Sequence, residues 1–221
     1  MSEALRYLRE IPEDVRPATA AAVLERGRIE DEAVIATLVD WAARGIAPVR
    51  VSARRITTIA GPIDEQTLEF VLDVGRWNEL DRAEQVLGNL LFTEMAHSAA
   101  LGLLDLKTAM RRHPVDYARG IAVWRATVVD DAVVLGLLQP GGKRRTPAGE
   151  ALAERMRALE RYLDDFGAFE DDPVAAHVLW GRYLAFAALF GKAERVLDEL
   201  GLKIPGDLHD TALALRALSA R

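Results

Sequence analysis

The sequence has no cysteine among its 221 residues. Disulfide bonds, a thiol nucleophile and a thiolate metal site are therefore excluded. Long apolar runs are also missing: the longest near-apolar segment, Val178 to Phe190, has 13 residues and contains Arg182. A membrane-spanning helix needs about 20 predominantly apolar residues. We therefore expect a core helix in this segment and no membrane insertion.

The N-terminus lacks the apolar segment of a secretory signal, because Glu3, Arg6, Arg9 and Glu10 interrupt its first ten residues. The sequence thus predicts a cytoplasmic protein. Apolar residues make up 50% and charged residues 28% of the chain. This mixture is typical of globular domains that bury a core, and the length suits one compact domain or two small ones.

Basic charge is scarce, since the net charge is −6 and only residues 101–150 have an excess of Lys and Arg. Nucleic-acid-binding proteins usually carry a basic field, because phosphate contacts dominate their affinity. The overall charge therefore disfavours a nucleic-acid partner but leaves room for a local basic patch.

Helix signals dominate the first part of the chain. Pro17 suits the first turn of a helix that ends at Gly27, and Asp31 suits the N-cap of a second helix that ends at Gly45. In this second helix one face carries three apolar residues, Val34, Leu38 and Trp41. Residues 46–51 and 54–59 are rich in β-branched residues and flank Ser52-Ala53, which predicts a short hairpin. Two short helices and a hairpin are typical of a winged-helix unit.

Three helices are expected next, from Asp64 to Val74, from Asn78 to Ala96 and from Leu103 to Arg112. The winged-helix pattern then returns more faintly. One helix begins at Pro114 and runs through Trp124, a second runs from Val128 to Leu135, and Pro140-Gly141-Gly142 forms a turn.

A long helix is expected after that turn, with Thr146 as its N-cap and Pro147 in its first turn. One face of this helix is apolar and carries Leu152, Met156, Leu159 and Leu163. The predicted fold is therefore mostly α with short β-hairpins, in two winged-helix-like halves joined by helices. The predicted parts are an N-terminal unit (1–63), connecting helices (64–112) and a second unit with C-terminal helices (113–221).

Residue types that can act in catalysis or bind metals and phosphate are not arranged in any known motif. The four histidines are not spaced as metal ligands, and Gly141-Gly142-Lys143 lacks the remainder of a phosphate-binding loop. Asp172 before Pro173 is interpreted as a helix N-cap, and the pairs Asp130-Asp131 and Asp164-Asp165 as caps or solvated positions. We expect no catalytic residue, metal or cofactor, although an enzyme remains open.

Basic residues provide the only candidate contacts. The candidates for contact with nucleic acid or a partner are Lys143, Arg144, Arg145, Arg111 and Arg112. The alternative is that these cations cap helix ends and solvate strand edges. The expected recognition helices, 31–44 and 127–138, are apolar and acidic, which suits a protein partner better than base edges.

Two parts of the chain resemble a known family. Thr146 to Leu152 follows the pattern TP-x-G-x-x-L, Tyr183 to Arg195 follows YL-x-F-A-x-x-x-G-x-A-x-R, and Ala36 to Gly45 reads ATL-x-x-W-A-x-R-G. The chain resembles the cytosolic tail of the YciQ-like predicted membrane proteins, a bacterial family without an assigned function. The resemblance implies an apolar membrane hairpin between these parts, and this sequence has none.

The leading hypothesis is a non-enzymatic protein-interaction or regulatory module that binds a protein partner or itself. One alternative is a winged-helix DNA-binding regulator that uses the basic residues. The other alternative is an enzyme or small-molecule binder with a site between the two halves.

Overall fold

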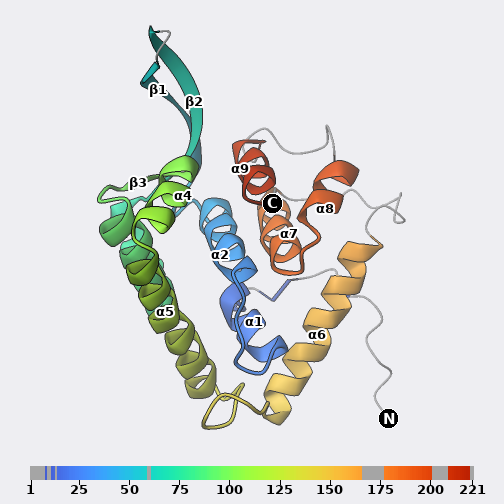
Figure 1. Cartoon of the computed structure of the whole chain (residues 1–221). Coiled ribbons are helices and arrows are strands. Elements are labelled where there is room, and N and C mark those ends of the chain that lie inside the picture. The colour runs from blue at the N-terminus through green and yellow to red at the C-terminus, as the bar shows by residue number, and fades with distance from the viewer. Residues whose placement is uncertain are drawn as a thin grey trace.

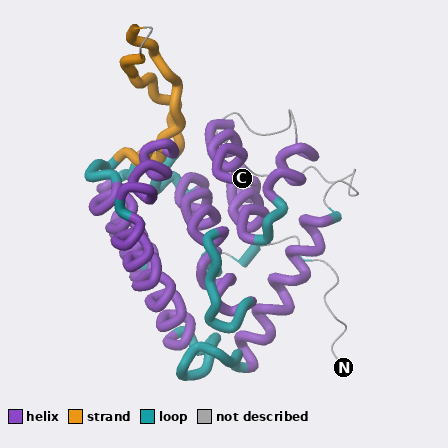
Figure 2. Tube along the Cα trace, in the orientation of Figure 1, coloured by secondary structure: helices purple, strands orange, loops and turns teal. Residues whose placement is uncertain are grey.

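The structure, a computed structural model, describes residues 8, 11–12, 14–58, 61–165, 177–200 and 209–219. Within these ranges the protein is mostly helical with one antiparallel sheet of strand order β1-β2-β3. This confirms the predicted fold class of helices with short hairpin strands. The sheet lies at one end of the molecule and the helices form the rest (Figure 2).

The first two helices, α1 (Pro17–Leu24) and α2 (Glu32–Ala43), begin as predicted. Pro17 occupies the first turn of α1, and the chain turns at Gly27, whose φ is +86°. A side chain at Gly27 would place its Cβ 2.7 Å from the carbonyl oxygen of Gly142, so the turn at Gly142 approaches too closely for any other residue. Asp31 precedes α2 but forms no cap, because its carboxylate accepts a 2.7 Å hydrogen bond from Arg125 instead.

Helix α2 lies at the centre of the molecule (Figure 1). Nine of its twelve residues are buried, including Val34, Leu38 and Trp41 as predicted. It packs against α1 on one side and against α7 (His177–Leu189) and α9 (His209–Ser219) on the other. A helix buried to this extent has no free face for the recognition of a partner.

The hairpin is longer than the sequence predicted. β1 (Val49–Thr58) runs through Ser52-Ala53 without a turn and pairs with β2 (Gly61–Val71), in a register from Val49 opposite Phe70 to Thr58 opposite Gly61. The predicted helix from Asp64 to Val74 is therefore wrong. Buried Phe70 and Leu72 alternate as in a strand, and pairing with β1 outweighs the local helix preference of this segment.

A mixed helical segment follows β2. It contains the 3₁₀ helix η1 (Val74–Glu79), the α-helix α3 (Arg82–Gly88) and the π-helix η2 (Asn89–Met95). The predicted helix from Asn78 to Ala96 thus begins later, after a capping box in which Asp81 and Glu84 accept each other's backbone N–H groups. The short strand β3 (Ala100–Gly102) pairs with β2 and leads into α4 (Leu103–Arg112), whose bounds match the prediction.

Helix α5 (Pro114–Val134) is one continuous helix of 21 residues, whereas the sequence analysis expected two. No proline interrupts it after Pro114. Its glycine, Gly120, lies where the Leu90 side chain packs, and a Cβ there would be 2.3 Å from Leu90 Cδ1. The residues from 128 to 135 therefore belong to the same helix as Trp124.

The predicted turn at Pro140-Gly141-Gly142 is present, and its flanking strands are reduced to a single bridge between Leu138 and Arg145. Helix α6 (Pro147–Asp164) follows, and the Thr146 hydroxyl caps it by accepting a 3.1 Å hydrogen bond from the Gly149 N–H. The predicted apolar face is confirmed, since all four of its side chains are buried: Leu152, Met156, Leu159 and Leu163.

The C-terminal helices α7, α8 (Ala193–Leu200) and α9 contribute to a core that includes buried residues near both ends of the described chain. The side chains from Tyr183 to Ala188 are buried, which confirms the predicted core helix over its described part. The N-cap predicted at Asp172, before Pro173, lies outside the described residues. Among the residues that the structure describes, no helix is both long enough and apolar enough to span a membrane.

Candidate functional site

A buried ionic network joins α2, α3 and α7. The Arg44 guanidinium donates to Asp40 Oδ2 at 3.0 Å and to Glu84 Oε1 at 2.6 Å, and Trp41 Nε1 donates to the same Glu84 oxygen at 3.0 Å. Arg182 Nε lies 3.8 Å from Asp40 Oδ1. This network could not be predicted from the sequence, because Glu84 and Arg182 are far from Asp40 and Arg44 in the chain.

The electrostatics of the network suit a structural role. Asp40 is fully buried, and burial raises its pKa although Arg44 and Arg16 act in the opposite direction. Arg182 donates to the carbonyl oxygens of Pro12 and Val15 at 3.0 and 2.8 Å. The network therefore ties the N-terminal segment to α2 and α7, and none of its members lines the groove described below.

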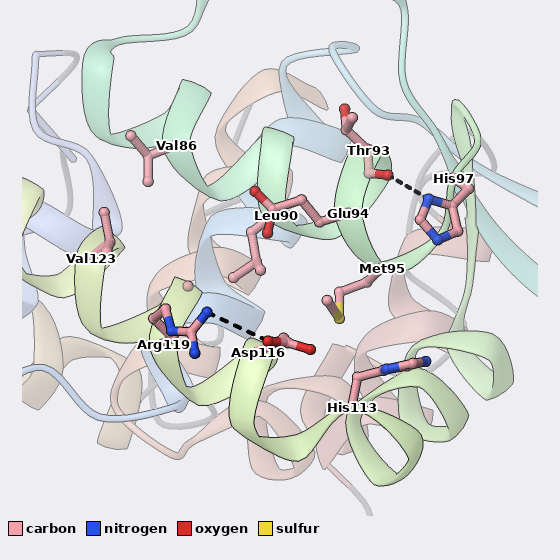
Figure 3. Close-up of a pocket in the computed structure, with 11 residues that line it drawn as sticks. Val86, Leu90, Thr93, Glu94, Met95, His97, His113, Asp116, Arg119 and Val123 are labelled. Carbon is pink, nitrogen blue, oxygen red and sulfur yellow. Dashed lines mark hydrogen bonds and ion pairs between the residues drawn. The ribbon is translucent and has the colours of Figure 1, made fainter.

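The groove lies between η2 and the first half of α5 (Figure 3). It encloses about 630 Å³. Glu94, Met95 and His97 come from the η2 side, while His113, Asp116 and Arg119 come from the other side. Short π-helical segments are often found at functional sites.

Two polar side chains of the groove, His97 and Arg119, interact with groups one turn away in the chain. His97, whose φ of +50° is unusual for a residue other than glycine, has Nδ1 2.9 Å from the Thr93 carbonyl oxygen. Arg119 Nη1 lies 3.6 Å from Asp116 Oδ1. Within the described part of the chain, no group of three or more His, Asp or Glu residues could hold a metal ion.

The outer side of α5 continues from this groove and is unusually apolar. Val115, Val123, Val134 and the adjoining Leu135 are 68, 52, 84 and 64% exposed. They are four of the seven large hydrophobic side chains that are exposed among the described residues. Three small side chains between them are also exposed: Ala118, Ala122 and Ala126.

Charged residues on this outer side are few, and the exposed ones are Asp116, Arg119 and Asp130. The opposite side of α5 carries Ile121, Trp124, Val128 and Ala132, which are buried against the core. Helix α5 is therefore apolar around much of its circumference. Such a composition is typical of a helix that is covered on more than one side.

We call the outer side of this helix the outer face of α5. It is defined by eight residues: Val115, Ala118, Arg119, Ala122, Val123, Ala126, Asp130 and Val134.

The basic residues predicted as contacts do not form one surface. Lys143 and Arg144 are exposed in the loop after α5, whereas Arg111 and Arg112 are exposed at the end of α4, just before α5 begins. The two groups are thus separated by the length of a 21-residue helix, about 30 Å. Figure 1 shows these two positions at opposite ends of α5.

Arg145 differs from its two neighbours because it is buried. Its guanidinium donates to the carbonyl oxygens of Val23, at 2.6 Å, and Leu24, and it pairs with Glu150 at 3.0 Å. These carbonyls belong to the last turn of α1, where the helix leaves its acceptors without partners. Arg145 therefore caps α1 and is not presented at the surface.

The acidic pair Asp130-Asp131 meets one cation of α3. Arg82 Nε lies 3.0 Å from Asp131 Oδ1, and Arg82 Nη2 lies 3.9 Å from Asp130 Oδ2. Asp164 of the second pair binds Lys192 at 2.7 Å. These contacts are ion pairs between elements, whereas the sequence analysis interpreted the acidic pairs as caps or solvated positions.

Residues 126–200 match the family model described as "Predicted membrane protein (DUF2207) C-terminal domain". The match covers the second half of α5, the loop with Lys143 and Arg144, and helices α6 to α8. It supports a DUF2207-type domain of unknown function in this part of the chain, and the narrower resemblance to the YciQ-like proteins stays a prediction. No curated protein and no solved structure was found to match the chain.

Proposed function

We propose that this protein is a non-enzymatic protein-interaction module that binds its partner through the outer face of α5. The observation that carries the proposal is the row of exposed valines on this helix, of which Val134 is 84% exposed. Contiguous exposed apolar surface on a soluble domain marks an interaction site, because its burial against a partner is favourable. A cytoplasmic location is part of the proposal.

The polar outer surface of α6 contrasts with the outer face of α5. The outward positions of α6 are charged, with Glu154, Arg155, Arg157 and Arg161 exposed. Helices α5 and α6 therefore have opposite kinds of outer surface, although both are long helices at the edge of the molecule (Figure 1). Of these two helices, α5 has the surface composition that is typical of the centre of an interface.

Site-specific photo-crosslinking tests this proposal. A photoreactive amino acid at Val123 is expected to give a covalent product with a protein in the cells that make this chain. The same amino acid at Arg155, an exposed position of α6, is the matched control and is expected to give none. Equal labelling at the two positions, or no protein product from position 123, would contradict the proposal.

The alternative of a DNA-binding regulator rests on the exposed pair Lys143 and Arg144. Two neighbouring cations make few phosphate contacts, and Arg145 is engaged with α1. Duplex binding near physiological salt that disappears when Lys143 and Arg144 are replaced by alanine would favour this alternative over the interaction module.

A further inference from the structure

We propose that the partner of the outer face of α5 is α5 of a second copy of this chain, packed antiparallel in a two-fold symmetric dimer. This inference rests on the proposed function and adds the identity of the partner. It is based on the order of residues along the outer face, which matches itself when it is read in the opposite direction.

Six of the eight positions of the outer face match in spacing along the helix axis. Along α5 the outer face presents Val115, Arg119, Val123, Ala126, Asp130 and Val134. If a two-fold axis passes midway between Val123 and Ala126, Val115 lies level with Val134 of the partner subunit along the helix axis, and Val123 lies level with Ala126 of the partner subunit. Around the helix the members of these pairs differ by about 100° and about 60°. A two-fold interface requires one surface that is complementary to itself, and the charged pair Arg119 and Asp130 meets that requirement most closely.

The charges satisfy the same symmetry. In this register Arg119 lies opposite Asp130 of the partner subunit, and the reciprocal pair forms on the other side of the axis. Each of the two residues lies about 8 Å from the midpoint along the helix, and they differ by about 20° around it. The two opposite charges are therefore placed to form two intermolecular ion pairs that flank an apolar centre.

Both charged groups are available for these pairs. The side chains of Arg119 and Asp130 are each 73% exposed. Their contacts within the chain are long, 3.6 Å from Arg119 to Asp116 and 3.9 Å from Asp130 to Arg82. Surface pairs at such distances contribute little stability, so a partner can compete with them. Arg82 keeps its closer contact with Asp131 at 3.0 Å.

Small residues allow the two helices to approach. Ala118, Ala122 and Ala126 lie one turn apart on the outer face and are exposed. Alanine at successive turns permits helix axes to come close enough for the valines to contact the opposite backbone, at interaxial distances of about 8 Å. The alanines thus permit close approach of a helix of the same sequence at the centre of this face.

A membrane surface fits the same face less well. Helices that lie on membranes carry several Lys or Arg residues beside their apolar side, and these attract anionic lipids. The outer face of α5 contains one arginine and one aspartate, Asp130, and Asp116 lies beside it, in a chain of net charge −6. Electrostatics therefore favour a partner that contributes both signs of charge, as a second copy does.

Charge reversal tests the dimer, with sedimentation equilibrium of the full chain at micromolar to near-millimolar concentrations as the measurement. Wild type is expected to show a concentration-dependent monomer–dimer equilibrium. R119D and D130R each place like charges opposite one another twice and are expected to weaken dimerisation at least about tenfold. The double variant R119D/D130R restores both ion pairs and is expected to recover most of the wild-type affinity. R155D, a charge reversal on α6, is expected to leave the equilibrium unchanged.

The outcomes separate this inference from the proposed function. Dimerisation that both single variants lose and the double variant regains supports the antiparallel register. A monomeric wild type, or a double variant as weak as the single variants, overturns the dimer. If the Val123 photo-crosslink then joins a different protein, the proposed function stands and only the second copy is wrong. Binding of a monomeric wild type to anionic phospholipid vesicles would assign the face to a membrane and overturn both.

Discussion

At the scale of the residue, Arg145 shows that neighbouring cations can have different roles, because it is buried while Lys143 and Arg144 are exposed. Within Lys143-Arg144-Arg145 the sequence gives no reason to separate the third cation from the first two. The fold separates them, because Arg145 pairs across the bridge with Leu138 and so points its guanidinium at the end of α1. The close contact of Gly27 with Gly142 brings the loop to that helix end. Burial of a residue in a cationic run thus depends on a contact more than a hundred residues away.

Replacement of Arg145 by alanine is expected to lower the free energy of unfolding by about 3 kcal/mol, because two carbonyl oxygens of α1 and Glu150 lose their donor. Urea unfolding followed by circular dichroism measures the change. Arg144→Ala is the matched control, and since Arg144 is exposed we expect a change within about 0.5 kcal/mol. Equal unfolding midpoints for the two variants would show that Arg145 does not support α1.

Asp40 gives a pH dependence of stability with a definite sign. Its pKa in the folded protein is raised above the ordinary value of 3.8, mainly by burial and against the effect of Arg44. A raised pKa means that the folded state holds the proton more tightly, so Asp40 adds stability below 3.8 and this contribution is lost as the pH rises through the folded pKa. Arg16, Glu84 and Arg182 also act on this carboxyl group.

Asp40→Asn removes this titration. The difference in unfolding free energy, wild type minus variant, is expected to increase as the pH falls from the raised pKa towards 3.8. Urea unfolding at a series of pH values measures this difference. Because both proteins contain the other carboxyl groups with raised pKa values, Asp81 and Asp131, subtracting the unfolding free energy of the variant cancels their contribution. A difference that decreases on acidification would indicate a carboxylate that the arginines stabilise instead.

At the scale of the element, the sequence predicted those helices whose signals are local. Pro17 in a first turn and Thr146 as an N-cap each act within one helical turn, and α1 and α6 begin where these residues indicate. The hairpin was placed wrongly because its register depends on pairs such as Val49 with Phe70, which are distant in sequence. Local propensity describes such a strand poorly, since packing and pairing decide it.

The candidate interaction surface was missed for a related reason. The second half of α5 was interpreted as a separate recognition helix, which concealed the continuous outer face from Val115 to Val134. The signal that could have found it is the presence of apolar or alanine residues on every side of a 21-residue helix. Which side packs on the core is set by α1, α3 and η2, and the sequence of α5 alone does not contain that information.

At the scale of the whole molecule, parts distant in sequence share one interior. Helix α2 packs on α7, α1 packs on α5, α6 and α7, and Arg182 holds the carbonyls of Pro12 and Val15. Among the residues that the structure describes, one core includes side chains from Ile11 to Leu215. The division into winged-helix-like parts at residues 63 and 112 remains a prediction, and the cooperativity of unfolding can test whether these parts are independent units.

We expect a single unfolding transition in scanning calorimetry, with a van't Hoff enthalpy equal to the calorimetric enthalpy, because the opening of any part exposes the apolar surface and the buried charges of the others. The Asp40 network strengthens this coupling, since the loss of α7 would leave a buried carboxylate without Arg182. The R119D variant, measured at low micromolar concentration, removes any contribution of self-association, which would otherwise make the transition temperature depend on concentration. Two resolved transitions in this variant would contradict a shared core and would support independent units at the predicted boundaries.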